Sequence, residues 1–239
     1  MSKPLMIAHR GYAGYEKENT LVSFTAAGAK KEYYGIETDV HVSKDNHYVI
    51  IHDNTTDRVS NGKYCIDVEK STFKQIQKVR LSDNNYPESE RYDLVIPELI
   101  DYLRICKRYN KVAILELKQI YNSRQINRII KIVKEADMMK QIVFISFFLD
   151  DLILVRQKLK RVPLQWLVGP IDDSHIAIMK EHKLDCDIQF NALSVELIEK
   201  LHANNILVNC WTVDAQEDAD RLASWGVDFI TSNRLDHTN

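Results

Sequence analysis

The sequence predicts an α/β fold, a (β/α)8 TIM barrel that occupies residues 1–239 as a single domain. Short apolar runs rich in β-branched residues alternate with amphipathic segments almost to the end of the chain. This alternation is typical of βαβ units around a parallel sheet. About eight such units in a chain of 239 residues match the size of a TIM barrel.

Nine segments have the composition of strands, one more than the barrel needs. They are residues 4–9, 35–40, 48–53, 111–118, 141–147, 162–168, 186–190, 206–213 and 228–232. Helix-like segments such as residues 19–31 and 97–109 separate most of them.

The additional strand is explained by residues 35–53, where only a short polar stretch separates two strands. A parallel crossover needs about a dozen residues, so we expect an antiparallel β-hairpin at the second strand position. If the chain turns at Asp45 and Asn46, Asp39 lies opposite His52.

Residues 54–93 do not follow the alternation. This segment is polar and rich in Asn, Asp, Lys and Ser, and it precedes a helix that opens at Pro97. We expect a small insertion that caps the C-terminal face of the barrel. Its own cluster of apolar side chains would come from Tyr64, Ile66, Val68, Phe73, Ile76 and Val79.

Composition excludes several classes of function. The net charge of −2 provides no field that would attract nucleic acid or an anionic membrane. The apolar run at residues 5–8 is too short for a signal-peptide core or a membrane span. We therefore expect a cytoplasmic protein without stable membrane insertion. No zinc site or disulfide framework is indicated by the widely spaced cysteines, Cys65, Cys106, Cys186 and Cys210.

Ionisable side chains gather at the C-terminal ends of the first strands. Active sites of TIM barrels are built at that face from several strands. Residues two apart on a strand point to the same side, which applies to Glu37 with Asp39 and to Glu116 with Lys118. The candidate set is His9, Arg10, Glu37, Asp39, His52, Glu116 and Lys118.

These residue types indicate phosphodiester cleavage. Three carboxylates in one barrel mouth repel one another, and a hard divalent cation such as Mg²⁺ or Ca²⁺ removes that conflict. Two histidines beside the cation can divide general-acid and general-base catalysis. The fixed charges of Arg10 and Lys118 suit a phosphate.

Several blocks resemble the glycerophosphodiester phosphodiesterase family. HRGYAGYEKENTLVSF resembles its opening signature, and IETDVHVSKDNHYVIIHD resembles its Glu-x-Asp strand, turn and His-Asp ending. LELK, WTVD and VDFITSN are similar to later elements of the family. Coverage is weakest between Asn54 and Pro97.

The resemblance implies hydrolysis of a small-molecule glycerophosphodiester to sn-glycerol 3-phosphate and an alcohol such as choline, ethanolamine or glycerol. It implies an acid–base pair of His9 and His52, and Mg²⁺ or Ca²⁺ bound by Glu37, Asp39 and Glu116. It further implies that Arg10 and Lys118 contact phosphate, that Glu18 orients the site, and that Trp211 lines the substrate pocket. The insertion after His52 matches the family's cap, which shapes the alcohol-binding side.

Three departures from the family pattern are visible. Lys17 replaces the usual Pro, and Asn46 replaces the Gly of the turn, although Asn tolerates the left-handed conformation. Residues 231–234 read Thr-Ser-Asn-Arg instead of Thr-Asp-x-Pro, which leaves the role of the last loop open.

Two other functions remain alternatives. A lysophospholipase D-like enzyme acting on lipid would need an apolar rim facing the membrane, and the sequence shows no exposed aromatic cluster. A non-catalytic glycerophosphodiester-binding protein would have little use for His9 and His52. The attacking nucleophile, water or the glycerol 2-hydroxyl, and the oligomeric state stay open.

The remaining tryptophans and histidines are not expected to take part in catalysis or binding. Trp166 and Trp225 are expected to serve packing. Surface positions are expected for the other histidines, His41, His47, His175, His182, His202 and His237.

Overall fold

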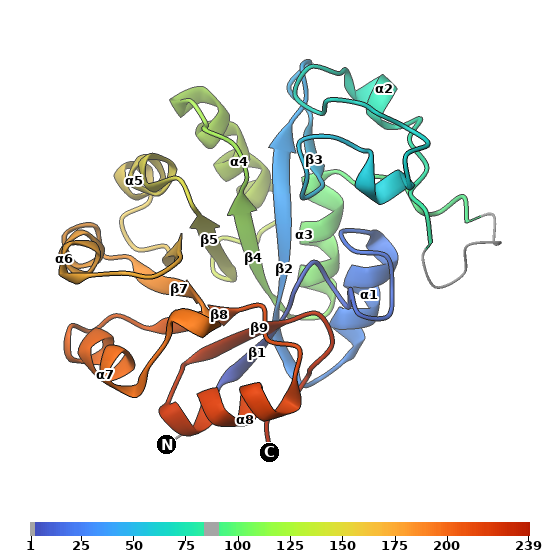
Figure 1. Ribbon diagram of the computed structural model, residues 1–239. Coiled ribbons are helices and arrows are strands. Elements are labelled where there is room, and N and C mark those ends of the chain that lie inside the picture. Colours follow the sequence, from blue (N-terminus) through green and yellow to red (C-terminus); the bar gives the residue numbers. More distant parts are fainter. Residues whose placement is uncertain (1–2, 84–90) are drawn as a thin grey trace.

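The computed structural model describes residues 3–83 and 91–239, and its sheet closes into a barrel (Figure 1). The strands are β1 (Leu5–Ala8), β2 (Tyr33–Val42), β3 (Tyr48–Ile50), β4 (Val112–Leu117), β5 (Ile142–Ser146), β6 (Leu164–Val168), β7 (Asp185–Gln189), β8 (Val208–Trp211) and β9 (Phe229–Ser232). Their order is β1-β9-β8-β7-β6-β5-β4-β2-β3, and β1 also pairs with β2, which closes the ring. All ring pairings are parallel, and β3 pairs antiparallel with β2 outside the ring. The predicted TIM barrel is confirmed.

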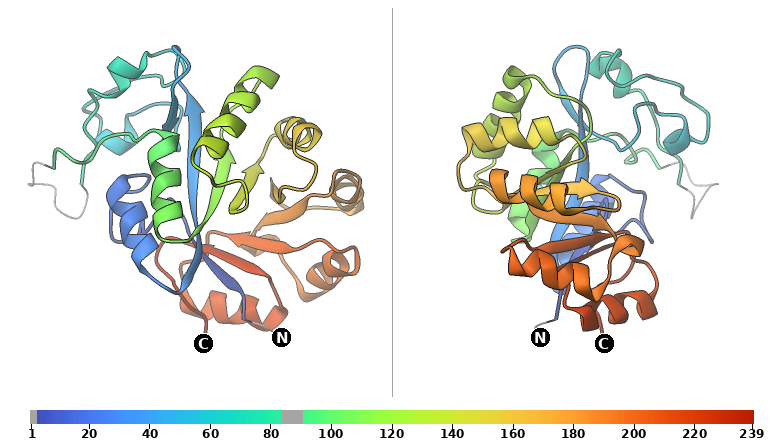
Figure 2. Two further views of the ribbon diagram at one scale, coloured as in Figure 1. Left: turned by 180° about the vertical axis from the view of Figure 1, so that it is seen from behind. Right: turned by 60° about the vertical axis from the view of Figure 1, so that its left-hand side comes forward.

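Helices cover the outside of the barrel (Figures 1 and 2). They are α1 (Leu21–Ala29), α3 (Leu99–Arg108), α4 (Ser123–Glu135), α5 (Leu149–Lys158), α6 (Asp173–His182), α7 (Val195–Ala203) and α8 (Gln216–Trp225). The short helix α2 (Phe73–Ile76) lies apart from this layer, beside the hairpin (Figure 1), and short 3-10 turns lie at Arg58–Ser60 and Phe190–Ala192. Capping boxes begin α4 at Asn122 and α6 at Asp172, where each side chain accepts from backbone N–H groups of the first turn. Among the helices of the described ranges, none has the length and apolar character to cross a membrane.

Two apolar layers hold the barrel. The larger layer lies between the strands and the helices, where Phe24, Tyr102 and Phe144 are fully buried. A smaller cluster that includes Ile7 and Ile114 fills the barrel interior. Ionisable side chains at the strand ends therefore stand above an apolar base.

Trp166 and Trp225 pack at the edge of the outer layer, as predicted. His41 does not match its predicted surface position, because its side chain is fully buried on β2. Its Nε2 lies 3.3 Å from the main-chain oxygen of His52, and Glu69 of the inserted segment covers its other side. The remaining histidines are at least partly exposed.

The predicted β-hairpin between β2 and β3 is present, but its register was predicted one residue out. Ser43 N–H donates to His47 O at 2.8 Å, which closes a three-residue turn with Asn46 at φ 64°. The expected turn had two residues. Ile51 N–H consequently donates to Asp39 O at 3.1 Å, so Asp39 faces Ile51 and not His52.

The described part of residues 54–93 lies beside the hairpin (Figure 1) and forms a second apolar cluster. Residues 84–90 of the predicted insertion lie outside the described residues. The cluster buries Val68, Ile76 and Val79, with Tyr64, Ile66 and Phe73 partly buried around them. Val49 and Ile51 of the hairpin belong to the same cluster. The segment is thus attached to the barrel through apolar contacts with β3 and its flank.

Candidate active site

The chain turns sharply where β1 ends. Arg10 and Gly11 adopt φ values of 53° and 83°, and a Cβ atom on Gly11 would lie 2.4 Å from Ser23 Oγ. Glycine is therefore required at position 11. The turn directs the Arg10 N–H onto Glu37 Oε2 at 2.9 Å and leaves the His9 side chain above the barrel interior.

Three buried carboxylates occupy the centre of this face. Glu37, Asp39 and Glu116 offer ligand oxygens that all lie within 4.8 Å of one another. Asp39 and Glu116 are neighbours in the β2–β4 pairing. Within the described part of the chain, Glu37 Oε1 and Asp39 Oδ1 are buried without a hydrogen-bond partner.

The electrostatics of this cluster reflect crowding of like charges. Burial raises the pKa of Glu37 well above its usual value, and the charges of Asp39 and Glu116 add to the effect. Burial and Asp39 raise the pKa of Glu116 to about 8. Burial opposes ionisation of Asp39 too, but Arg10 and Lys118 hold its pKa below the usual range. Three crowded, buried carboxyl groups fit a hard divalent cation, which would neutralise their combined negative charge and bind the oxygens that have no partner.

Polar neighbours hold Asp39 in place. Asn19 Nδ2 donates to Asp39 Oδ2 at 2.7 Å, and Thr38 Oγ1 donates to Asn19 Oδ1 at 2.7 Å. Arg10 Nε lies 3.4 Å from the same Asp39 oxygen. Lys118 Nζ lies 2.9 Å from Glu116 Oε1 and 3.7 Å from Asp39 Oδ1. The positively charged side chains of Arg10 and Lys118 thus border the carboxylates on the side that faces the cavity.

His9 is oriented by the last loop. Its Nδ1 lies 2.8 Å from Asn233 Oδ1, and the Asn233 amide donates to Asp214 Oδ2 at 2.7 Å. Because this amide oxygen can only accept, Nδ1 carries the proton and Nε2 is left with its lone pair, 3.9 Å from Glu37. Burial and the Arg10 guanidinium lower the pKa of His9 to about 4, so the ring is neutral near pH 7.

His52 belongs to a separate chain of charged groups. Its Nδ1 lies 2.7 Å from Asp53 Oδ1, and Asp53 accepts from Arg58 Nε at 2.6 Å. Arg58 also donates to both oxygens of Glu18 at 2.7 and 2.8 Å, and Glu18 accepts from Arg10 Nη1 at 3.0 Å. Burial lowers the pKa of His52, although the carboxylates around it act in the opposite direction.

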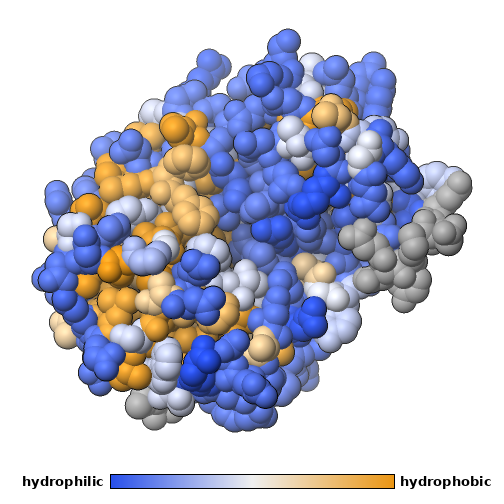
Figure 3. Space-filling view, in the orientation of Figure 1, coloured by the Kyte–Doolittle hydropathy of each residue, from blue (hydrophilic) through white to orange (hydrophobic). Residues whose placement is uncertain are grey.

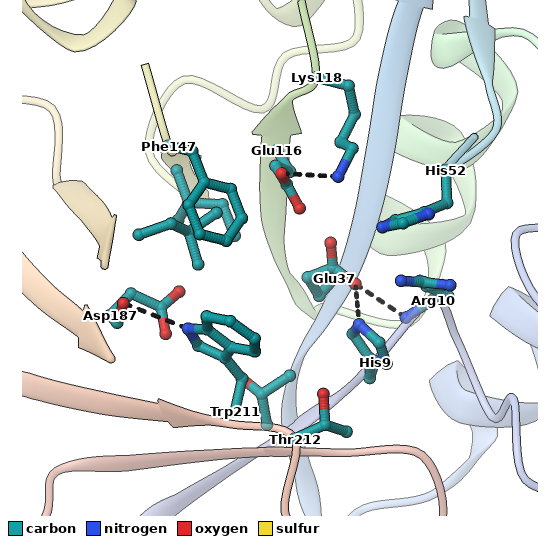
Figure 4. A pocket seen from close by; sticks show the side chains of 13 residues that line it. His9, Arg10, Glu37, His52, Glu116, Lys118, Phe147, Asp187, Trp211 and Thr212 are labelled. Carbon is teal, nitrogen blue, oxygen red and sulfur yellow. Dashed lines mark hydrogen bonds and ion pairs between the residues drawn. The ribbon is translucent and has the colours of Figure 1, made fainter. Parts of the chain in front are cut away.

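The cavity has an ionic wall and an apolar wall (Figure 4). Its volume is about 110 Å³. It is lined by His9, Arg10, Glu37, His52, Glu116, Lys118, Ile145, Phe147, Leu167, Asp187, Trp211, Thr212 and Thr231. Figure 3 shows the same division on the surface, with apolar residues on one side and hydrophilic residues toward the centre.

The structure brings most of the predicted site residues to this cavity. Asp39 and Glu18 are exceptions, because Asp39 lies behind the lining residues and Glu18 contacts Arg10 and Arg58 instead. Trp211 lines the apolar wall and meets Phe147 edge to face at 5.6 Å.

Sequence reasoning missed further residues of the site: Asp53, Arg58, Asp187, Asp214 and Asn233. Arg58 lies in the segment set aside as an insertion, and Asn233 lies where the sequence departs from the family pattern. Asp214 is the last residue of WTVD, a block that resembles an element of the family. Its place in that block could have identified Asp214 as a residue of the site.

Comparison with known proteins identifies the family. The profile of the Glycerophosphoryl diester phosphodiesterase family matches residues 9–237. A glycerophosphodiester phosphodiesterase of Caldanaerobacter subterraneus subsp. tengcongensis is 31% identical over 97% of this chain and 94% of its own length. One of Bacillus subtilis is 26% identical over 97% of this chain and 84% of its own.

A solved structure shares the architecture. A phosphodiesterase of Oleispira antarctica in complex with the product sn-glycerol-3-phosphate superimposes with a TM-score of 0.88. It is 22% identical, and the match covers 98% of this chain and 94% of that one. Together with the sequence matches, the barrel places this chain among its relatives: it belongs to the glycerophosphoryl diester phosphodiesterase family.

Proposed function

We propose that the protein hydrolyses glycerophosphodiesters to sn-glycerol 3-phosphate and an alcohol, in a metal-dependent reaction with histidine acid–base catalysis. The observation that carries the proposal is the arrangement around the cavity. Two histidines with different partners flank three buried carboxylates and two cationic side chains. The names of the relatives and the sn-glycerol-3-phosphate bound by the Oleispira antarctica protein support the same reaction.

The proposed roles follow from charge. Arg10 and Lys118 bind the phosphate, whose negative oxygens they attract. Glu37, Asp39 and Glu116 hold one divalent cation, Mg²⁺ or Ca²⁺, through oxygens that otherwise have too few partners. When bound there, such a cation would supply positive charge that offsets the negative charge developing on the phosphate oxygens.

The two histidines are assigned different steps because their partners differ. His9 is neutral and donates Nδ1–H to Asn233, so its Nε2 accepts the proton of the nucleophile. Burial lowers the pKa of His52, but the Asp53 carboxylate 2.7 Å from its Nδ1 acts in the opposite direction and stabilises the protonated ring, so His52 is assigned the donation of a proton to the departing alkoxide. The nucleophile is either water or the glycerol 2-hydroxyl. A cyclic phosphate trapped by phosphorus NMR would support the second route.

The inserted segment is proposed to act as a cap on the alcohol-binding side. Arg58 comes from this segment and contacts Asp53 and Glu18, which adjoin the catalytic residues. The position of His52 thus depends on the docking of the segment.

An apolar rim favours one second candidate, activity on lysophospholipids. Contrary to the expectation from the sequence, Phe147 and Phe148 are exposed directly after β5, with Ile120 exposed after the neighbouring β4. Activity on lysophospholipid micelles in preference to water-soluble diesters would favour this candidate.

The proposal is tested by identifying the product. Glycerophosphocholine is supplied to the protein, and a coupled dehydrogenase measures glycerol 3-phosphate, with His52→Ala as the matched control. We expect release by the wild type and a loss of about 10²–10⁴-fold in the variant. Tight binding without release of product would instead identify a binding protein.

A further inference from the structure

Asp187 is a buried carboxyl group in the cavity that the proposed mechanism does not use. It stands on β7, across the cavity from the ionic wall (Figure 4). The residue is only 2% exposed, and its Oδ1 has no hydrogen-bond partner among the residues that the structure describes. A buried polar atom without a partner destabilises a folded protein, so a ligand that supplies the partner is the natural explanation.

The surroundings of Asp187 differ from those of the three clustered carboxylates. Burial raises its pKa to about 8, and a hydrogen bond with Asn209 acts weakly in the other direction. No cationic side chain of residues 3–83 and 91–239 contributes to this shift, whereas Arg10 and Lys118 both act on Asp39. The carboxyl group therefore carries its proton at neutral pH and offers an O–H donor together with an acceptor.

Neighbouring polar groups of the barrel interior are already paired. Asn209 Nδ2 donates to Gln165 Oε1 at 3.1 Å, and Thr231 Oγ1 donates to Asn209 Oδ1 at 3.2 Å. This leaves the free oxygen of Asp187 without a partner among the side chains beside it.

An aromatic pair frames the same part of the cavity. Trp211 Nε1 donates to the main-chain oxygen of Asp187 at 3.2 Å, which holds the indole beside the carboxyl group. Phe147 meets this indole edge to face. Apolar walls with one precisely placed polar group are typical of sites that bind a short carbon chain bearing a hydroxyl.

We propose that Asp187 is a substrate-binding residue that hydrogen-bonds a hydroxyl group, while Arg10 and Lys118 hold the phosphate on the opposite wall. Because Asp187 lies across the cavity from these cationic side chains, the hydroxyl is one remote from the phosphate: either the terminal hydroxyl of the glycerol that is retained in the product, or a hydroxyl of the departing alcohol. The inference rests on the proposed function and adds a determinant of substrate choice to it.

The test compares Asp187→Leu, which removes both polar atoms, with Asp187→Asn, which keeps a donor and an acceptor in the same shape. Three diesters serve as substrates: glycerophosphocholine, glycerophosphoglycerol, and the phosphocholine ester of propane-1,2-diol. The last one keeps the hydroxyl next to the phosphate ester but lacks the terminal hydroxyl of glycerol.

If Asp187 binds the retained glycerol, Asp187→Leu lowers kcat/KM about 10–100-fold for both glycerol-containing diesters and leaves the propanediol ester unchanged. If it binds the departing alcohol, only glycerophosphoglycerol is affected. In either case Asp187→Asn should stay within about threefold of the wild type, because it can still pair with a hydroxyl.

An equal loss on all three substrates would overturn the inference in favour of a structural role, and no loss on any would overturn it as well. A loss confined to the two choline esters would assign the position to the ammonium group instead. A wild-type protein that is inactive on every diester would overturn the proposed function, and this inference with it. Wild-type turnover without a substrate-dependent effect overturns the inference alone.

Discussion

Replacing Asn233 with leucine should show how far the last loop controls catalysis. The side chain accepts the hydrogen bond of His9 Nδ1 at 2.8 Å and connects it to Asp214. Leucine has a similar volume but no polar atom, so the partly buried imidazole N–H loses its partner and the ring loses the group that sets its tautomer.

An unmade hydrogen bond of a buried group costs about 1–3 kcal/mol. If this free energy adds to the activation barrier, because His9 is no longer held in its reactive orientation, kcat decreases about 5–150-fold. The Michaelis constant should change little, because Arg10 and Lys118 still bind the phosphate.

The assay is steady-state release of glycerol 3-phosphate, with Asn127→Leu as the control. Asn127 is exposed on α4, and α4 lies on the outside of the barrel. Thermal unfolding of both variants shows whether the fold is kept. An unchanged kcat in a folded Asn233→Leu protein would refute the role given to this loop.

Four further predictions concern the site. His9→Ala or His52→Ala should lower turnover about 10²–10⁴-fold while leaving the unfolding midpoint nearly unchanged, and a near-wild-type rate would remove either from the acid–base pair. Glu116→Gln should weaken binding of Mg²⁺ or Ca²⁺ measured by titration calorimetry, whereas an unchanged dissociation constant would exclude it as a ligand. Arg58→Gln should lower kcat about 10–100-fold because the partner of His52 loses its support; full activity would show that the bridge is dispensable. The raised pKa of Asp187, about 8, means that the folded state keeps a proton that the unfolded chain releases near pH 4. The free energy of unfolding should therefore fall as pH rises from about 4 to 8, and Asp187→Asn should lose that part of the pH dependence; identical profiles in urea titrations would contradict the buried, protonated state.

Much of the fold follows from local patterns in the chain. Alternation of apolar runs with helical segments predicts the barrel, because each strand must be buried on both faces. The spacing of Glu37 and Asp39 also predicts that both reach the same site, since side chains alternate along a strand. The hairpin register was less predictable, because one additional turn residue before His47 shifts every pair.

The residues that were mispredicted or missed depend on contacts between distant segments. His41 follows Asp39 by two residues on β2, so strand alternation places both side chains on the same side. Its cover by Glu69 of the inserted segment depends on docking that the spacing does not indicate. Arg58 acquires its role only when the segment docks against Glu18. Asn233 and Asp187 each stand alone in the sequence, without a partner at an informative distance, and become meaningful only when the barrel closes.

The central claim is that the three clustered carboxylates hold a divalent cation required for cleavage of glycerophosphodiesters. The most direct measurement is glycerol 3-phosphate release from glycerophosphocholine by metal-stripped protein, before and after addition of Mg²⁺ or Ca²⁺. We expect negligible release from the stripped protein and recovery when one of the ions is added. Undiminished release without metal, or no release with either ion across several headgroups, would contradict it.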